Sequence, residues 1–112
     1  MKRIECVLRP SRLHAVKAAL AEEGITGMTV SDVRGTGRGA GPTETLNGVT
    51  YTAALPPKIK IEIVAPDEAV DPIIALVLDH ARTGEPGDGK IWVLPALAAV
   101  RIRTGDVGDE VL

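Results

Sequence analysis

Aromatic side chains are almost missing from this chain of 112 residues, which contains no phenylalanine, one tryptophan and one tyrosine. Proteins that bind nucleic acid through its backbone combine basic grooves with aromatic side chains on which bases stack. The formal net charge here is −2 at pH 7, so neither feature is present. These absences argue against nucleic-acid binding and leave the hydrophobic core to Ile, Val, Leu and Ala.

Cysteine and long apolar runs are also scarce. Cys6 is the one cysteine, so it has no disulfide partner within the chain, and its apolar pattern favours a buried thiol over a nucleophile. The sequence shows neither a signal-peptide pattern nor an apolar run long enough to span a bilayer. We therefore expect one cytoplasmic domain over residues 1–112, which reaches a membrane only through a partner.

Hydrophobic periodicity predicts a first unit of strand, helix and strand. KRIECVLRP (residues 2–10) alternates apolar and polar residues as a strand does. Ser11 is a candidate cap for the following helix, and Gly24 stands where a left-handed residue ends it. The apolar face of this helix consists of Leu13, Val16 and Leu20. GMTVSDV (residues 27–33) is the second predicted strand.

A second unit begins at KIKIEIV (residues 58–64), where isoleucines occupy one face and charged residues the other. Either Asp67 or Asp71 could cap the next helix, and Asp71 is preferred because it puts Pro72 at the first helical position. The apolar stripe of this helix consists of Val70, Ile73, Ile74, Val77 and Leu78. We expect the helix to end near Thr83.

KIWVLP (residues 90–95) predicts a fourth strand, and AVRIR (residues 99–103) predicts a short terminal strand. This order predicts an α+β fold, a ferredoxin-like βαββαβ sandwich with both helices on one sheet face and a long loop between strands two and three. The other sheet face would be exposed and rich in Val and Ile, which predicts self-association.

Two glycine-rich segments interrupt the pattern. Residues 35–57 hold five glycines and three prolines without a sustained period, and such long loops are usually functional or disordered. Residues 82–90 end at Lys90, directly before the fourth strand. Glycines let backbone N–H groups converge on an anion, and Lys90, Arg101 and Arg103 add charge suited to phosphate. The pattern is neither a Walker A loop nor a Rossmann fingerprint, so an ordinary turn remains an alternative to an anion site.

RTGEPGDGKIWV (residues 82–93) closely resembles the C-terminal signature of the PII signal-transduction family, R-T-G-x-x-G-D-G-K-I followed by Phe or Trp and Val. KRIECVLRP, GITGMTVSDVRGTGR, PKIKIEIV and VRIRTG are similar to their PII counterparts in order and spacing. The resemblance covers nearly the whole chain, including the length of the gap between Arg38 and Lys58.

The resemblance implies a homotrimer that binds ATP or ADP in clefts between subunits. One subunit would contribute its GDGK loop and the base of the long T-loop (about residues 36–57), and its neighbour would contribute the RIR segment with Arg101 and Arg103. Thr29 and Val64 would lie near the adenine. The nucleotide-binding residues carried over are Thr29, Gly35, Gly37, Arg38, Val64, Gly87, Asp88, Gly89, Lys90, Arg101 and Arg103.

Departures from the family concentrate in the T-loop. The family's glutamine after Arg38, which helps to hold Mg²⁺ and 2-oxoglutarate, is Gly39 here. Magnesium would then bind only through nucleotide phosphates, while Lys58, which pairs with the 2-oxoglutarate carboxylate in the family, is retained. Tyr51 falls at the nucleotidylated position with changed neighbours, so a modified tyrosine and an ordinary loop tyrosine both remain open.

The expected function is a non-enzymatic sensor, whose T-loop docks on a transporter or metabolic enzyme. Within that class, a divergent sensor of nucleotide plus another small anion such as bicarbonate is the alternative to 2-oxoglutarate sensing. A slow ATPase is disfavoured because the sequence offers no carboxylate pair, Cys/His arrangement or metal cluster, and His14 and His80 are interpreted as solvated. The retained GDGK and RIR segments argue against a structural trimer without a ligand.

Overall fold

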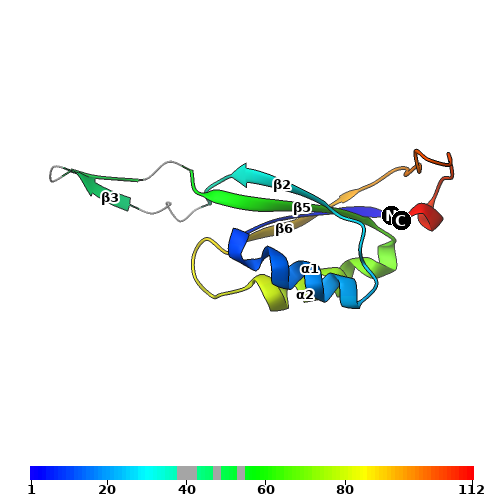
Figure 1. The fold of residues 1–112 in the computed structure, drawn as a ribbon, viewed down its shortest axis with the longest axis horizontal. Helices are drawn as coiled ribbons and strands as arrows, with labels where there is room; N and C mark the ends of the chain where they lie inside the picture. The colour runs from blue at the N-terminus through cyan, green and yellow to red at the C-terminus, as the bar shows by residue number, and fades with distance from the viewer. Residues whose placement is uncertain (38–42, 47–48, 53–54) are drawn as a thin grey trace.

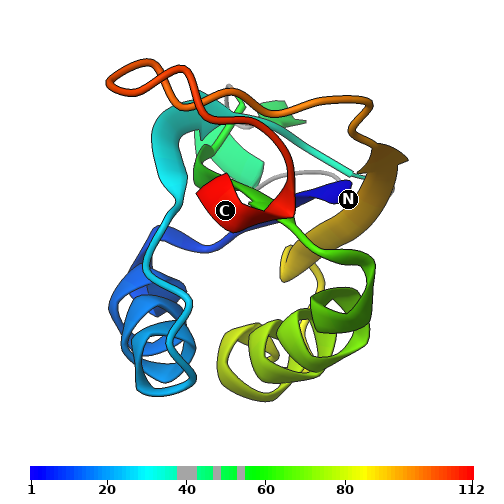
Figure 2. The same cartoon turned by 90° about the vertical axis from the view of Figure 1, so that its right-hand side faces the viewer.

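A computed structural model describes residues 1–37, 43–46, 49–52 and 55–112. Four antiparallel strands form its main sheet in the order β2-β5-β1-β6. They are β1 (Lys2–Leu8), β2 (Thr29–Arg34), β5 (Pro57–Ala65) and β6 (Gly89–Pro95). Helices α1 (Leu13–Glu22) and α2 (Val70–Ala81) cover one face of this sheet (Figures 1 and 2). The predicted α+β class is confirmed.

The core lies between the helices and the two central strands. Alternation turns one side of β1 and β5 toward the helices, and burying each large aliphatic side chain there contributes about 1.5–3 kcal/mol. The buried side chains are Ile4, Cys6, Leu8, Val16, Leu20, Ile59, Ile61, Ile63, Ile73 and Val77. Burial raises the pKa of the Cys6 thiol to about 11, so the predicted inert thiol is supported at neutral pH.

Both helices follow 3₁₀ turns, η1 (Pro10–Arg12) and η2 (Asp67–Ala69), which the sequence did not predict. Ser11 lies inside η1 and caps nothing, so its predicted role is wrong. The predicted Asp71 cap is also wrong, because α2 already begins at Val70. Pro72 is tolerated in that first turn because the first N–H groups of a helix have no intrahelical acceptor.

The uncovered face of the sheet is largely charged, and the prediction that it is rich in Val and Ile is wrong for Ile, although Val7, Val33 and Val64 do lie on it. Strand alternation sends the isoleucines of β5 to the helix side and the intervening Lys60 and Glu62 to the open side. Glu5, only 7% exposed, accepts a hydrogen bond from Trp92 Nε1 at 2.8 Å and pairs with Arg3 Nε at 3.1 Å and Lys60 Nζ at 3.5 Å. Buried charge on this face is therefore paired.

The C-terminal segment is not the predicted strand. Within it, Val100 and Val107 form an isolated antiparallel bridge, and a turn at Gly105 (φ +74°) reverses the chain. The Arg101 N–H donates to the Asp106 carbonyl at 2.9 Å, so the segment pairs with itself rather than with the sheet. A short 3₁₀ turn, η3 (Asp109–Val111), follows. The apolar Leu97 and Ile102 are 97% and 100% exposed.

The T-loop contains a two-stranded hairpin, β3 (Thr43–Leu46) and β4 (Val49–Thr52), where the sequence predicted no regular structure. Figure 1 shows it beyond the ends of β2 and β5. The sequence does contain an indication of this hairpin: an Asn-Gly pair flanked by alternating residues is the strongest short-range hairpin pattern. The predicted modification residue Tyr51 lies on β4 opposite Glu44. Arg38 and Gly39 fall outside the described residues.

Candidate ligand-binding site

One cleft of about 630 Å³ brings the two glycine-rich segments together. It opens between the base of the T-loop and the loop that precedes β6, and its volume suits a small-molecule ligand. The predicted site residues that line it are Gly35, Gly37, Lys58, Gly87, Asp88, Gly89 and Lys90. These residues come from distant parts of the sequence, and the pairing of β5 and β6 with the central strand β1 brings them close.

The loop before β6 needs glycine for steric reasons. Gly84, Gly87 and Gly89 have φ values of +90°, +100° and +101°, in the left-handed region that side chains disfavour. At Gly89 the requirement is strict, because a Cβ there would lie 1.6 Å from the Val7 carbonyl oxygen. Strand β6 therefore starts in close contact with β1, and this contact is a reason for glycine that the sequence did not predict.

The carboxylate of Asp88 organises this loop from within. Its Oδ2 accepts the backbone N–H groups of Thr83 and Gly84, both at 2.9 Å. Its Oδ1 accepts the Thr83 hydroxyl at 2.5 Å and Arg9 Nε at 3.0 Å. These hydrogen bonds, led by the one from the Thr83 hydroxyl, hold the pKa of Asp88 far below its usual range. Because both carboxylate oxygens accept hydrogen bonds, the Asp88 side chain stabilises the conformation of the loop.

Two cations hold the loop from outside. Arg9, directly after β1, also donates from Nη2 to the Pro86 carbonyl at 2.7 Å, and Lys58 Nζ donates to the Gly87 carbonyl at 2.6 Å. No pattern in the sequence predicted these roles for Arg9 and Thr83. The register between β1 and β6, which pairs Leu8 with Gly89, places Arg9 beside Asp88. Only a strand pairing, not a local motif, could have identified it.

The cleft is basic although the chain is slightly acidic. Its described lining includes the basic side chains Arg34, Lys58, Lys60 and Lys90 and the acidic Glu85 and Asp88. Asp88 is already paired with Arg9 and loop N–H groups, and Lys60 is already paired with Glu5 and Glu62. The other basic side chains of the lining, Arg34, Lys58 and Lys90, outnumber the one remaining carboxylate, so positive charge is in excess. Lys90 is exposed, pairs in register with Val7, and lines the cleft together with it. Such a site attracts anions.

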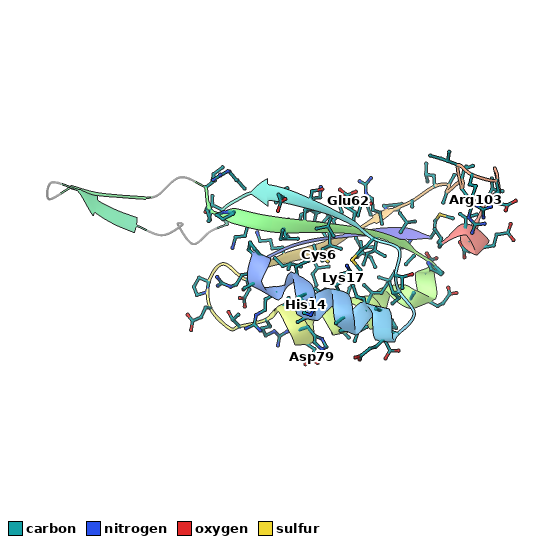
Figure 3. The ribbon with its side chains drawn as sticks, viewed as in Figure 1. Cys6, His14, Lys17, Glu62, Asp79 and Arg103 are labelled. Carbon is teal, nitrogen blue, oxygen red and sulfur yellow. The ribbon has the colours of Figure 1, made fainter. Side chains whose placement is uncertain are left out.

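The remaining predicted residues lie elsewhere. Thr29 and Val64 line a second cleft, of about 540 Å³, together with the C-terminal Val111 and Leu112. Arg101 forms an ion pair with Asp106 at 3.5 Å, and Arg103 lies in the C-terminal segment, at the end of the molecule away from the hairpin (Figure 3). A single chain therefore does not bring all predicted nucleotide contacts into one cleft.

Side chains that could support other chemistry are sparse. In the described part of the chain, no group of three or more His, Cys, Asp or Glu could hold a metal ion. His14 is exposed on α1, as predicted. His80 is partly exposed, and its Nδ1 donates to the Leu76 carbonyl at 2.9 Å, so the solvated interpretation holds only in part. Nor is any helix in the described ranges long and apolar enough to cross a membrane.

Comparison with known proteins agrees with this architecture. The family described as "Nitrogen regulatory protein P-II" matches residues 1–106. The chain is 49% identical over 110 residues to the nitrogen regulatory protein P-II of Microchaete diplosiphon, covering 98% of each chain. It is 46% identical over 112 residues to nitrogen regulatory protein P-II 1 of Escherichia coli, covering 100% of each. The chain thus belongs to the nitrogen regulatory protein P-II family, and these two relatives carry the names of regulatory proteins, not of enzymes.

Proposed function

We propose that this chain is a signal-transduction protein that binds ATP or ADP between the subunits of a homotrimer and regulates a transporter or metabolic enzyme through its T-loop. The observation that carries the proposal is the basic cleft in which the loop before β6 faces Gly35 and Gly37. Membership in a family of nitrogen regulatory proteins supports the regulatory part.

Phosphate binding is the first step that the cleft's residues can perform. Positive-φ glycines expose backbone N–H groups without a Cβ to block an anion's approach. Lys90 supplies positive charge, and the T-loop base forms the wall of the cleft opposite the loop before β6. The fixed hydrogen bonds of Asp88 keep this loop ordered before a ligand arrives, which reduces the entropy lost on binding.

Assembly into a homotrimer would complete the site. The strand order β2-β5-β1-β6 with two helices on one face fits the ferredoxin-like topology expected for such subunits. Neither Arg101 nor Arg103 lines the chain's own Lys90 cleft, and Arg103 lies at the end of the molecule away from the hairpin (Figure 3), which supports their delivery to a neighbour's cleft. Thr29 and Val64 would reach the adenine from the same neighbour. In this arrangement, phosphate oxygens replace the Asp106 carboxylate as the partner of Arg101.

Signalling would follow from the position of the T-loop. Its base, at Gly35, Gly37 and Lys58, forms one wall of the cleft, and the β3–β4 hairpin extends from that base. A ligand that binds one arrangement of this wall better than another shifts the population of hairpin positions. The docking partner would respond to that change in hairpin position.

The second effector distinguishes two versions of this function. Gly39 lacks the amide oxygen that the family's glutamine offers to Mg²⁺, so we expect weak or no binding of 2-oxoglutarate. Lys58 still supplies a counter-charge at the cleft. A smaller anion such as bicarbonate that needs no chelated metal is the alternative effector for the same cleft.

Calorimetric titration with ATP, ADP and AMP, each with and without Mg²⁺ and 2-oxoglutarate, tests the proposal. We expect ATP or ADP to bind at three sites per trimer, with a trimer mass by light scattering at micromolar concentration. Absence of binding by either nucleotide, or a monomeric mass, would refute it.

A further inference from the structure

Arg9 has no role in the proposed function so far, yet it makes the most extensive contacts with the loop before β6. Its guanidinium donates from Nε to Asp88 Oδ1 at 3.0 Å and from Nη2 to the Pro86 carbonyl at 2.7 Å. It does not line the cleft in which that loop faces the T-loop base. The side chain therefore contacts the loop next to the cleft-lining Gly87 without forming part of the cleft wall itself.

The loop needs an external anchor. Ordering this segment costs conformational entropy, because glycine loses the most backbone freedom when it is fixed. The segment contains three glycines with positive φ angles, Gly84, Gly87 and Gly89. The bonds from Thr83 and Gly84 to Asp88 close the loop on itself but do not tie it to the sheet. Arg9 provides that tie from the end of β1, beside the Lys58 contact with Gly87.

The anchor is itself held in place. Pro10 restricts the preceding residue to extended backbone, and Arg9 has φ −65° and ψ 136° at the N-terminus of η1. Its side chain is 29% exposed, so the ion pair with Asp88 is partly shielded from water. A Cβ on Gly87 would lie 3.2 Å from Arg9 Nη2, so the guanidinium is also near the loop's backbone.

We propose that Arg9 is a positioning residue of the nucleotide site: it fixes the loop of residues 83–89 in its binding conformation without touching the ligand. This inference rests on the proposed nucleotide binding. Arginine is suited to the role because a planar fork donates to two separate acceptors, Asp88 and the Pro86 carbonyl, which an ammonium group cannot reproduce with the same geometry.

The test uses Arg9→Met, Arg9→Lys and, as a matched control, Arg12→Met in the neighbouring 3₁₀ turn. In the ligand-free protein, we expect Arg9→Met to speed hydrogen exchange of the Thr83, Gly84 and Glu85 amides roughly tenfold while core strands β1 and β5 are unchanged. ATP and ADP affinities should fall roughly tenfold, the usual effect of losing one charge-assisted hydrogen bond. Arg9→Lys should give a smaller loss, and Arg12→Met none.

A double-mutant cycle with Asp88→Ala separates positioning from direct contact. Once the carboxylate is gone, adding Arg9→Met should reduce ATP affinity by much less than in the native background. An equal tenfold loss in both backgrounds would mean that Arg9 acts on the ligand itself, and would overturn the proposal. So would unchanged amide exchange in Arg9→Met.

The two ideas fail separately. If the native protein bound neither ATP nor ADP, the proposed function would fall, while amide exchange would still show whether Arg9 orders the loop. If nucleotide bound normally to both Arg9 variants, the positioning role would fall and nucleotide binding would stand. Should Arg9→Met fail to fold, Arg9→Lys carries the same comparison because it keeps the charge and removes the fork.

Discussion

The segments before and after β6 differ in how far their side chains find partners within the same chain. Before the strand, Asp88, Arg9 and Lys58 hold the loop with hydrogen bonds that start and end within the chain. After it, Leu97 and Ile102 stand almost fully in solvent, and Arg101 meets Asp106 only at 3.5 Å. The first segment is complete in one chain. The second leaves large apolar side chains in solvent, which a neighbouring copy would cover in the proposed trimer.

Gly89→Ala should break the first segment most severely. The new Cβ would collide with the Val7 carbonyl, and the φ of +101° already disfavours a side chain, so we expect a loss of about 3 kcal/mol or more in the free energy of unfolding. Urea unfolding measures it. Gly105→Ala is the control, since that glycine has φ +74° but open space around it, and should cost about 1 kcal/mol. Equal losses in the two variants would contradict the steric argument.

Ile102→Asp, in the segment after β6, should disrupt assembly with little effect on the fold of one chain. The side chain is 100% exposed, so a charge there costs nothing within the subunit but opposes burial against a neighbour. Light scattering should show a lower mass than the native protein at micromolar concentration, while circular dichroism stays unchanged. A native mass for this variant would mean that the C-terminal segment takes no part in assembly.

Lys90→Ala and Arg103→Ala test both segments at once, because Lys90 follows the loop before β6 and Arg103 lies in the segment after it. Each should weaken ATP or ADP binding by roughly ten- to a hundredfold, the value of a charge-assisted hydrogen bond, without unfolding the protein. Lys17→Ala, an exposed position on α1, is the control. Calorimetry measures all three, and unchanged affinity in both test variants would place the site elsewhere.

Gly39→Gln should produce a smaller, selective change. Restoring a metal-binding amide oxygen and removing one glycine, which costs roughly 0.5–1 kcal/mol relative to alanine when ordered, should strengthen 2-oxoglutarate binding in saturating Mg²⁺-ATP. ATP affinity alone should change little. Micromolar binding of 2-oxoglutarate by the native protein would argue instead for ordinary nitrogen sensing.

The pH dependence of stability should show the smallest effect. The folded-state pKa of Asp88 is lowered, so its stabilisation is present above the unfolded value of about 3.9 and is lost as pH falls below that value toward the folded one. Between pH 7 and 5 the Asp88 contribution should stay constant. Urea unfolding of the native protein and Asp88→Asn should therefore converge only below about pH 4. Parallel curves down to pH 2 would contradict this assignment.

Elements whose residues pack against the core were predictable. Alternation in β1 and β5 identified the buried Ile4 and Ile61, and Gly24 does end α1 with a φ of +79°. Predictions failed where tertiary contacts decide. The predicted Asp71 cap fails because the turn η2 already leads into α2 at Val70. The predicted strand around Arg101 fails because its backbone pairs with residues 105–108 instead. Arg9 became visible only through the register of two distant strands.

The scarcity of aromatics also has an optical consequence. Trp92 is the single indole in the chain, its N–H donates to Glu5 at 2.8 Å, and its ring lies on the wall of the basic cleft. Emission from this side chain is therefore free of other tryptophan signals and depends on the charge and hydration of that cleft. The protein carries its own fluorescent reporter, and an unlabelled sample can be titrated with any anion by following one band.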